Sequence, residues 1–348
     1  MKNARQPGGI GVRTGGVEHF PPASALITAL ELKNFRGFGE LTIAPFKRVN
    51  LLSGKNNTGK TGVLEALYLA LSDQNELVDQ VHRVFRQGAK NADQYWSWIF
   101  DRRSKLADVE ILVEANDLSI GRRFSRKKSE KQIERKGKLH WDLKNMIQDV
   151  YVLESDTHHQ ALLECAAITT VPRFPQQEAA DFTLLTRKKR RDQAIGLLRK
   201  IDARVQGIEI AVDSKGAPSI DVNLEGIPEM VPLNFLGQGF ARLLSIYSII
   251  LAENANVILI DEIENGIHHS AMRTVWDGLA LAARELDVQI FATTHSRECI
   301  LAAHEAFEAS ESYDLSLLRL ERHGEEVRAV AVDEGGIQIA EEFGLEVR

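Results

Sequence analysis

The sequence has few of the features that mark secreted or membrane-spanning proteins. Its two cysteines, Cys165 and Cys299, lie far apart and outside any metal-ligand spacing. That usage argues against a disulfide framework and suits a reducing cytosol. No apolar stretch approaches the ~20 residues that a membrane span needs, and the N-terminus lacks the apolar core of a signal peptide. We therefore expect a cytoplasmic protein with no membrane contact.

A net positive charge and regular repeats are lacking as well. The formal net charge is −6, so any contact with nucleic acid needs a local basic patch. No internal repeat and no sustained heptad series occur, which excludes a long coiled coil. The chain has 348 residues, of which 44% are hydrophobic, enough for one large globular domain or two ordinary ones.

The first motif that is present lies in "LLSGKNNTGKT", residues 51–61. It reads Gly-x-x-x-x-Gly-Lys-Thr between a short apolar strand pattern and a helical pattern over 63–71, as in a P-loop. Its glycines let backbone N–H groups surround a phosphate, and the helix N-terminus adds positive potential. The alternative is a flexible turn that only connects a strand to a helix. The predicted nucleotide-binding residues are Gly54, Asn56, Asn57, Thr58, Gly59, Lys60, Thr61 and Gly62.

Carboxylates follow a second predicted strand. The apolar run 257–260 ends in Asp261 and Glu262, at the edge where α/β sheets bind ligands. Asp261 and Thr61 fit magnesium, and Glu262 fits the group that orients or deprotonates an attacking water. A further strand pattern in "VQIFATTHS" ends in His295, a possible hydrogen-bond donor to the γ-phosphate. We predict catalytic roles for Glu262, His295 and Lys60.

A Gly-x-Gly turn opens the long apolar helix predicted in residues 234–254, and its N-terminus is a second possible anion site. With this turn, the order of motifs is that of ABC-type ATPase heads. The stretches "GKNNTGKT", "LGQGFARLLSI", "LIDEIENGIHHS" and "FATTHS" together resemble the ABC-like AAA ATPases of bacterial anti-phage defence. These are related to the OLD (overcoming lysogenization defect) proteins and to the ATPase subunits of PARIS- and Septu-type systems. The resemblance covers residues 26 to roughly 320.

This resemblance implies a fold class and a domain organisation. It implies an α/β, ABC-type P-loop NTPase head with a central mixed or parallel sheet, an antiparallel β lobe and a mainly helical insert. The head would span residues 26–348, with the insert at about 76–206, and residues 1–24 would form a flexible tail. Within the insert, residues 109–124 predict two strands joined by a turn, and residues 178–206 predict a helix.

The resemblance also implies ATP and Mg²⁺ as cofactors and adds site residues. In the family, the Gly-rich helix start contacts the γ-phosphate held by the opposite subunit, although transporter-like members have Ser where Gly237 stands. The "NFRGF" stretch lies near the nucleotide in related heads, and Gln148 is a candidate Q-loop ligand for the metal. The residues added in this way are Asn34, Phe35, Arg36, Gln148, Gly237, Gln238 and Gly239.

The expected partners follow from the same resemblance. OLD proteins continue into a Toprim nuclease domain, but only 53 residues follow His295 and no D-x-D pair occurs. We therefore expect an ATPase that forms a homodimer or higher homo-oligomer and controls a separate effector, a nuclease or a toxin. A phage protein or DNA would be the trigger.

Three other readings stay open. They are a RecF- or SMC-like head in DNA repair or chromosome maintenance, a non-hydrolysing nucleotide-dependent scaffold, and a transporter ATPase subunit. The motifs favour the transporter least. The basic runs 121–138 and 187–191 are solvated faces, nucleic-acid contacts or docking sites for an acidic partner.

Overall fold

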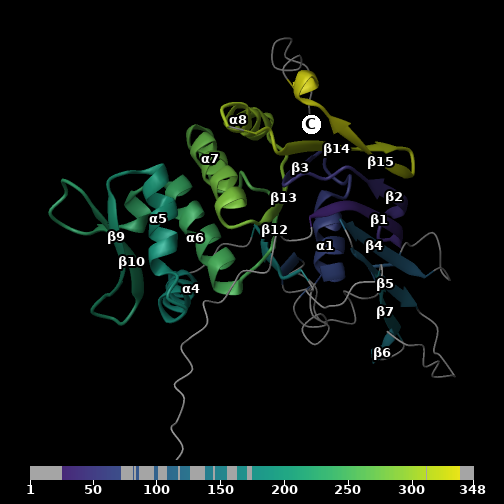
Figure 1. Cartoon of the computed structure of the whole chain (residues 1–348), viewed down its shortest axis with the longest axis horizontal. Coiled ribbons are helices and arrows are strands. Elements are labelled where there is room, and N and C mark those ends of the chain that lie inside the picture. Colours follow the sequence, from purple (N-terminus) through teal and green to yellow (C-terminus); the bar gives the residue numbers. More distant parts are fainter. Residues whose placement is uncertain are drawn as a thin grey trace, which may run out of the picture.

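Three β-sheets and two hydrophobic cores organise the described part of the chain (Figure 1). The computed structural model describes residues 26–71, 81, 84–85, 98–100, 108–116, 118–125, 138–143, 146–154, 163–170, 175–310 and 312–337. The predicted tail 1–24 and most of the basic run 121–138 lie outside these residues. Among the described helices, none is both long and apolar enough to cross a membrane.

The central sheet has six strands in the order β15-β14-β3-β13-β12-β8. Its strands are β3 (Val49–Ser53), β8 (Cys165–Ile168), β12 (Val257–Ile260), β13 (Gln289–Thr293), β14 (Leu315–His323) and β15 (Glu326–Val332). Neighbouring strands pair in parallel except β15, which is antiparallel to β14. Every residue of β3, β12 and β13 is buried, as the apolar sequences of these strands require when both faces of a sheet are covered. All three predicted motif strands, β3, β12 and β13, thus lie inside one sheet.

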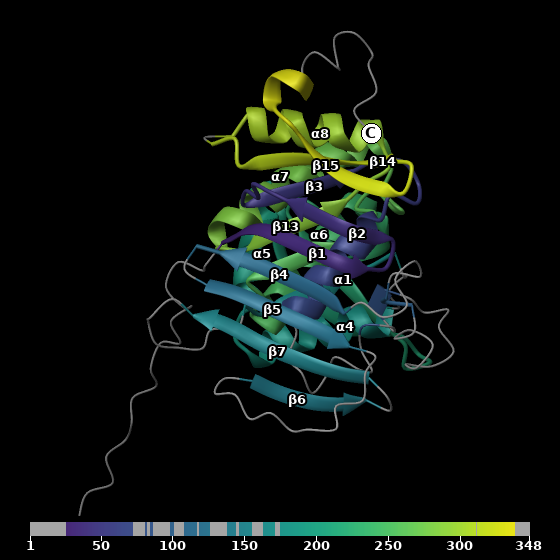
Figure 2. The ribbon, with the colours of Figure 1, turned by 90° about the vertical axis from the view of Figure 1, so that its right-hand side faces the viewer.

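An antiparallel sheet covers one side of the molecule, with strand order β2-β1-β4-β5-β7-β6 (Figure 2). Its strands are β1 (Ile27–Phe35), β2 (Phe38–Ile43), β4 (Val109–Ala115), β5 (Leu118–Ser125), β6 (Lys138–Leu143) and β7 (Met146–Glu154). Helix α1 (Lys60–Leu71) packs between this sheet and the central sheet, and all three share one hydrophobic core. The strand predicted before the P-loop is therefore β3, and the predicted strand pair in 109–124 is β4 and β5.

Helices cover the opposite face of the central sheet. They are α4 (Pro175–Arg187), α5 (Arg191–Ile201), α6 (Gln238–Glu253), α7 (His269–Glu285) and α8 (Arg297–Glu308). Beside α4 and α5 lies a small sheet of order β11-β10-β9, formed by β9 (Val205–Val212), β10 (Pro218–Leu224) and β11 (Val231–Pro232), and a 3-10 turn over Leu233–Phe235 leads into α6. These elements and the second face of the central sheet form the other core. The described part of the predicted insert thus contains both strands and helices.

The helical pattern predicted over 178–206 forms two helices and not one continuous helix, because residues 188–190 of the basic run form a turn between α4 and α5. Lys189 has a φ of 58°, a left-handed conformation that interrupts the helix. Lys188 Nζ donates to the carbonyl oxygen of Ala252, and Arg190 donates to that of Leu251. Part of the basic run therefore satisfies the C-terminal carbonyls of α6.

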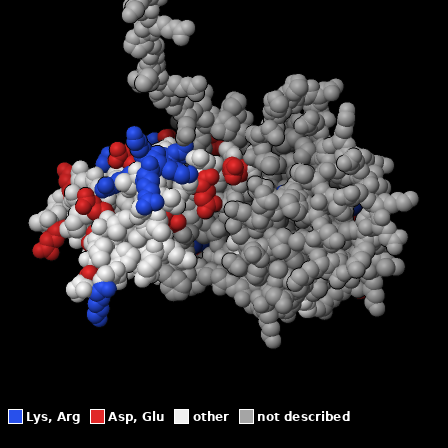
Figure 3. Space-filling view, turned by 90° about the horizontal axis from the view of Figure 1, so that it is seen from below, with Lys and Arg blue, Asp and Glu red and all other residues white. Residues whose placement is uncertain are grey.

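On the underside of the molecule, Figure 3 shows basic side chains gathered on one part of the described surface, flanked by acidic ones.

Candidate nucleotide site

The phosphate loop joins β3 to α1, and two of its glycines are required by close contacts. Gly54 has a φ of 135°, and a Cβ atom there would lie 2.5 Å from the carbonyl oxygen of Leu320 in β14. Gly59 has a φ of 101°, and a Cβ there would lie 2.3 Å from the ring of Phe38. Any side chain at either position would displace the loop, so glycine fixes its conformation against β14 and Phe38.

Hydrogen bonds hold the middle of the loop. Thr58 Oγ1 donates to the carbonyl oxygen of Lys55 at 2.9 Å, and the guanidinium of Arg322 donates to that of Asn57 at 3.1 Å. Asn56 and Asn57 are exposed, and Asn57 has a φ of 65°. Sequence reasoning missed Arg322, because it lies at the end of β14 and belongs to no motif.

Lys60 begins α1 and turns its ammonium group back into the loop. Its Nζ donates to the carbonyl oxygens of Gly54 at 2.6 Å and Lys55 at 3.1 Å. Burial lowers the pKa of Lys60 from 10.5 to about 8, because a buried ammonium loses its hydration. Nearby carboxylates act in the opposite direction on this pKa, namely Asp261, Glu264 and Glu262. The loop therefore holds a desolvated cation in the position that a P-loop uses for phosphate.

Thr61 and Asp261 meet although they are 200 residues apart. Thr61 Oγ1 lies 3.1 Å from Asp261 Oδ1 and 3.2 Å from Oδ2. The hydroxyl of Thr293, at the end of β13, also donates to Asp261 Oδ1, at 2.7 Å. Magnesium prefers hard oxygen ligands such as hydroxyl and carboxylate groups. The donor set of Thr61 and Asp261 therefore fits the metal that the sequence predicts.

Glu262 and His295 face each other across the ends of β12 and β13. Glu262 has a φ of 45°, and its amide donates to Thr293 Oγ1 at 2.8 Å. Its Oε1 lies 3.9 Å from Nε2 of His295, and both side chains are partly exposed. The His295 amide donates to Glu264 Oε1 at 2.6 Å. A carboxylate open to water beside an imidazole can accept a proton from an attacking water.

The predicted signature residues lie at the exposed start of α6. Gly237 precedes the helix with a φ of 91°, and Gln238 accepts a hydrogen bond from the His268 amide at 3.2 Å. Gly239 packs against Ala271 of α7, where a Cβ atom would come within 3.1 Å of the alanine side chain. Among the hydrogen bonds of the described residues, none joins this segment to the phosphate loop of the same chain.

The "NFRGF" residues already have partners inside the chain. Asn34 Nδ2 donates to the carbonyl oxygen of Asp108 at 3.0 Å. Arg36 forms a 2.7 Å ion pair with Glu65, a fully buried residue of α1. A Cβ atom on Gly62 would lie 3.8 Å from Arg36 Cδ, so Arg36 lies beside the first turn of the P-loop helix. The contact of Asn34 and Arg36 with nucleotide stays a prediction.

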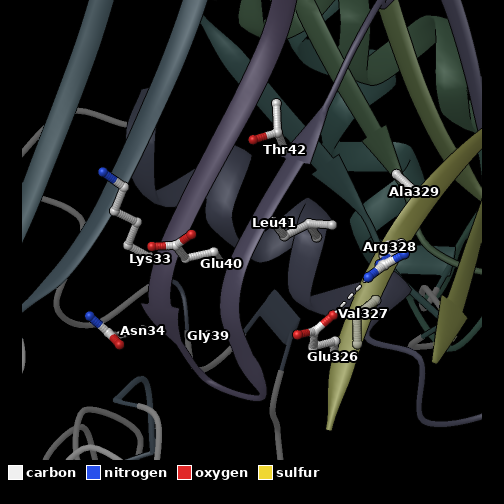
Figure 4. Close-up of a pocket in the computed structure, with 10 residues that line it drawn as sticks. All are labelled: Lys33, Asn34, Gly39, Glu40, Leu41, Thr42, Glu326, Val327, Arg328 and Ala329. Carbon is white, nitrogen blue, oxygen red and sulfur yellow. Dashed lines mark hydrogen bonds and ion pairs between the residues drawn. The ribbon is translucent and has the colours of Figure 1, made fainter. Parts of the chain in front are cut away.

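An open groove of about 770 Å³ runs between the edge strands β2 and β15 (Figure 4). It is lined by residues 39–42, residues 326–329, Lys33 and Asn34. Its charged side chains are of both signs, and Arg328 pairs with Glu326 at 3.1 Å. No phosphate-loop residue lines it, and Asn34 is the one predicted nucleotide-contacting residue among its lining residues.

Gln148, the Q-loop candidate, lies in β7, where it pairs with Phe124 of β5 and Trp141 of β6. Its side chain lies outside the part of the structure that is described. Its role as a metal ligand therefore stays a prediction.

Known proteins are similar to this chain in sequence. A family model described as "AAA domain, putative AbiEii toxin, Type IV TA system" matches residues 49–300. An ATP/GTP phosphatase of Helicobacter pylori is 24% identical over 332 residues, which cover 79% of this chain and 86% of the relative. The DNA replication and repair protein RecF of Nitrosococcus oceani is 51% identical over 43 residues, a match that spans only 12% of each chain.

Solved structures of SMC heads share the fold. An Smc head bound to the C-winged helix domain of ScpA superposes with a TM-score of 0.56 at 13% identity, covering 88% of this chain and 98% of that one. The SMC head domain of Thermotoga maritima gives a TM-score of 0.51 at 14% identity, covering 88% and 99%. The predicted fold class, an ABC-type P-loop head, is confirmed.

Proposed function

This chain belongs to the AAA domain family, and from that premise we propose that it binds ATP with magnesium and hydrolyses ATP to ADP and phosphate. The hydrogen bond between Thr61 and Asp261 carries the proposal. It joins the P-loop helix to the carboxylate strand and sets hydroxyl and carboxylate oxygens at the sheet edge that also holds the Lys60 ammonium. Those groups are the ones that bind magnesium and phosphates in P-loop enzymes.

Each residue then has a chemical task. Lys60, which now donates to two carbonyl oxygens, would donate to phosphate oxygens instead, and Thr61 and Asp261 would hold magnesium. Magnesium would neutralise charge on the phosphate oxygens. Glu262 accepts the proton of the attacking water, and His295 donates a hydrogen bond toward the γ-phosphate.

We propose further that the site is completed by a second copy of the chain. Gly237 and Gln238 are exposed at the start of α6, where the helix N-terminus favours an anion. The serine hydroxyl of transporter-like signatures is absent, so backbone N–H groups would contact the γ-phosphate of the opposite subunit. The assembly is a homodimer or a higher homo-oligomer.

At the cellular level, the proposal is a switch in anti-phage defence, located in the cytoplasm. Each chain would form one head, residues 26–348. ATP-dependent assembly of several such heads would hold or release a separate nuclease or toxin in response to DNA or a phage protein. The support is the resemblance of the four motifs to OLD-related ATPases. A RecF- or SMC-like role in DNA repair or chromosome maintenance is the second candidate, favoured by the fold and by the short RecF match. A non-hydrolysing scaffold is the third.

Turnover and assembly test these proposals together. Wild-type protein should release phosphate from MgATP, and Lys60→Ala should sharply weaken or abolish ATP binding in calorimetry. Unchanged ATP affinity in Lys60→Ala would contradict the P-loop assignment. Turnover stimulated by duplex DNA would favour the repair role, whereas a small partner released in the presence of ATP would favour the effector switch.

A further inference from the structure

Glu264 lies three residues after Asp261, in the loop between β12 and α7, and has no role in the chemistry described above. Its Oε1 accepts the His295 amide at 2.6 Å. We propose that Glu264 is a positioning residue, which holds His295 against Glu262 for ATP hydrolysis. This inference rests on the proposed function.

Within the described part of the chain, four hydrogen bonds join the β12 loop to the end of β13, and one of them reaches residue 295. The bond from the Thr293 hydroxyl to Asp261 Oδ1 is given above. The amide of Ile263 donates to the carbonyl oxygen of Thr293 at 3.0 Å, and the amide of Glu262 donates to the Thr293 hydroxyl at 2.8 Å. Both bonds end at the last residue of β13. The bond from Glu264 extends the connection two residues further, to His295. Glu264 therefore sets where the imidazole emerges from the sheet.

The residues on either side of His295 are fixed by other elements. The amide of Thr294 donates to the carbonyl oxygen of Leu52 in β3 at 3.0 Å. Ser296 caps α8, because its hydroxyl accepts the Cys299 amide at 3.1 Å. With its neighbours anchored, the peptide of residue 295 needs one acceptor to fix its orientation, and Glu264 supplies it.

The second carboxylate oxygen of Glu264 distinguishes this contact from an ordinary loop closure. Glu264 Oε2 is buried, and it has no hydrogen-bond partner in the described part of the chain. Burying a carboxylate oxygen without a hydrogen-bond donor costs free energy. A neutral amide or hydroxyl could accept the His295 amide with a smaller desolvation cost. The charge of Glu264 also acts on the ammonium of Lys60, together with Asp261 and Glu262. The position thus connects the phosphate-binding cation to the His295 segment.

Steady-state ATP hydrolysis by the full chain gives the first test. Glu264→Ala removes the acceptor, and we expect kcat to fall about 10- to 100-fold, the range for one hydrogen bond to a charged group. The KM for MgATP should change less than kcat, because Glu264 is not among the residues proposed to contact ATP. Glu264→Gln retains a carbonyl acceptor and should restore kcat to within about threefold of wild type. Glu305→Ala, which alters an exposed glutamate of α8, is the matched control.

A double variant separates positioning from a general loss of structure. Because Glu264 acts through His295, Glu264→Ala combined with His295→Ala should be no slower than His295→Ala alone. Losses that multiply would overturn the proposal. So would wild-type kcat in Glu264→Ala, or a Glu264→Gln enzyme as slow as Glu264→Ala.

Amide hydrogen exchange makes the inference independent of turnover. In Glu264→Ala the His295 amide should exchange at least about tenfold faster than in wild type, with the amides of β12 unchanged. If the wild-type protein does not hydrolyse ATP, the proposed function fails. The hydrogen-exchange rates then test by themselves whether Glu264 positions the His295 segment. Unchanged exchange at His295 would overturn the inference even in an active enzyme.

Discussion

Raising the pH from 7 to 9 is expected to weaken ATP binding about tenfold, because Lys60 loses its proton within this range. Burial in the phosphate loop lowers the pKa of Lys60 to about 8. Below that pH the side chain is an ammonium that attracts phosphate, and above it a neutral amine. The protonated fraction falls from about nine-tenths at pH 7 to about one-tenth at pH 9, and the apparent Kd rises by the inverse ratio. A lysine with its ordinary pKa of 10.5 would stay almost fully charged.

Calorimetric titration with MgATP at constant ionic strength measures this effect. Repeating the titration in buffers of different ionisation enthalpy also counts protons. Binding at pH 9, where about nine-tenths of Lys60 is neutral, should take up nearly one proton per ATP. Lys200→Ala is the matched control, because Lys200 is an exposed lysine that pairs with Glu285. This variant should show the full pH dependence.

Two results would refute the reasoning. A wild-type Kd that stays constant from pH 7 to 9 would mean that the Lys60 ammonium keeps its proton throughout. The same tenfold change in Lys60→Ala, measured on its weaker binding, would assign the titration to another group.

Three more predictions follow from the geometry. Glu262→Gln should keep ATP affinity and reduce turnover at least about 100-fold, with an ATP-bound assembly visible by light scattering; near-normal turnover would point to another base. Gly54→Ala should lower the free energy of unfolding by about 1–3 kcal/mol and abolish ATP binding, because the new methyl group would clash with the carbonyl oxygen of Leu320. A variant with the thermal unfolding and ATP affinity of wild type would contradict this contact. Replacing Lys188 and Arg190 with alanine should destabilise the fold by about 1–2 kcal/mol in urea unfolding, and an unchanged midpoint would show that they do not stabilise α6.

Much of the candidate site could be predicted from sequence, because its motifs are local. The glycines before Lys60 and the carboxylates after residues 257–260 each lie within a few residues of a strand with a clear apolar pattern. The rule that parallel strands gather ligands at their carboxyl ends then places Thr61 near Asp261 without any coordinates. The structure has these two groups in hydrogen-bond contact.

The residues that sequence reasoning missed act through contacts between distant segments. Thr293 and Glu264 join two loops only because β12 and β13 are neighbours, and no spacing in the chain records that pairing. The break between α4 and α5 was missed for a different reason. Lys189 adopts a left-handed conformation without a glycine or proline to mark it, and its basic neighbours are good helix formers.

Helix α6 connects the predicted signature segment at its start to the basic turn at its end. Its exposed start carries Gly237 and Gln238, and its last turn is held by Lys188 and Arg190, about 24 Å away for 16 residues at the rise of an α-helix. A helix of this length moves as a rod, so a shift at one end is a shift at the other. Thermodynamic linkage then makes the relation mutual. A polyanion or acidic protein that draws Lys188 away from Ala252 would change the strength of the proposed ATP-driven subunit association. Subunit association would change the affinity for that ligand by the same factor. A trigger that binds the basic turn could therefore change the extent of ATP-dependent assembly without contacting the nucleotide.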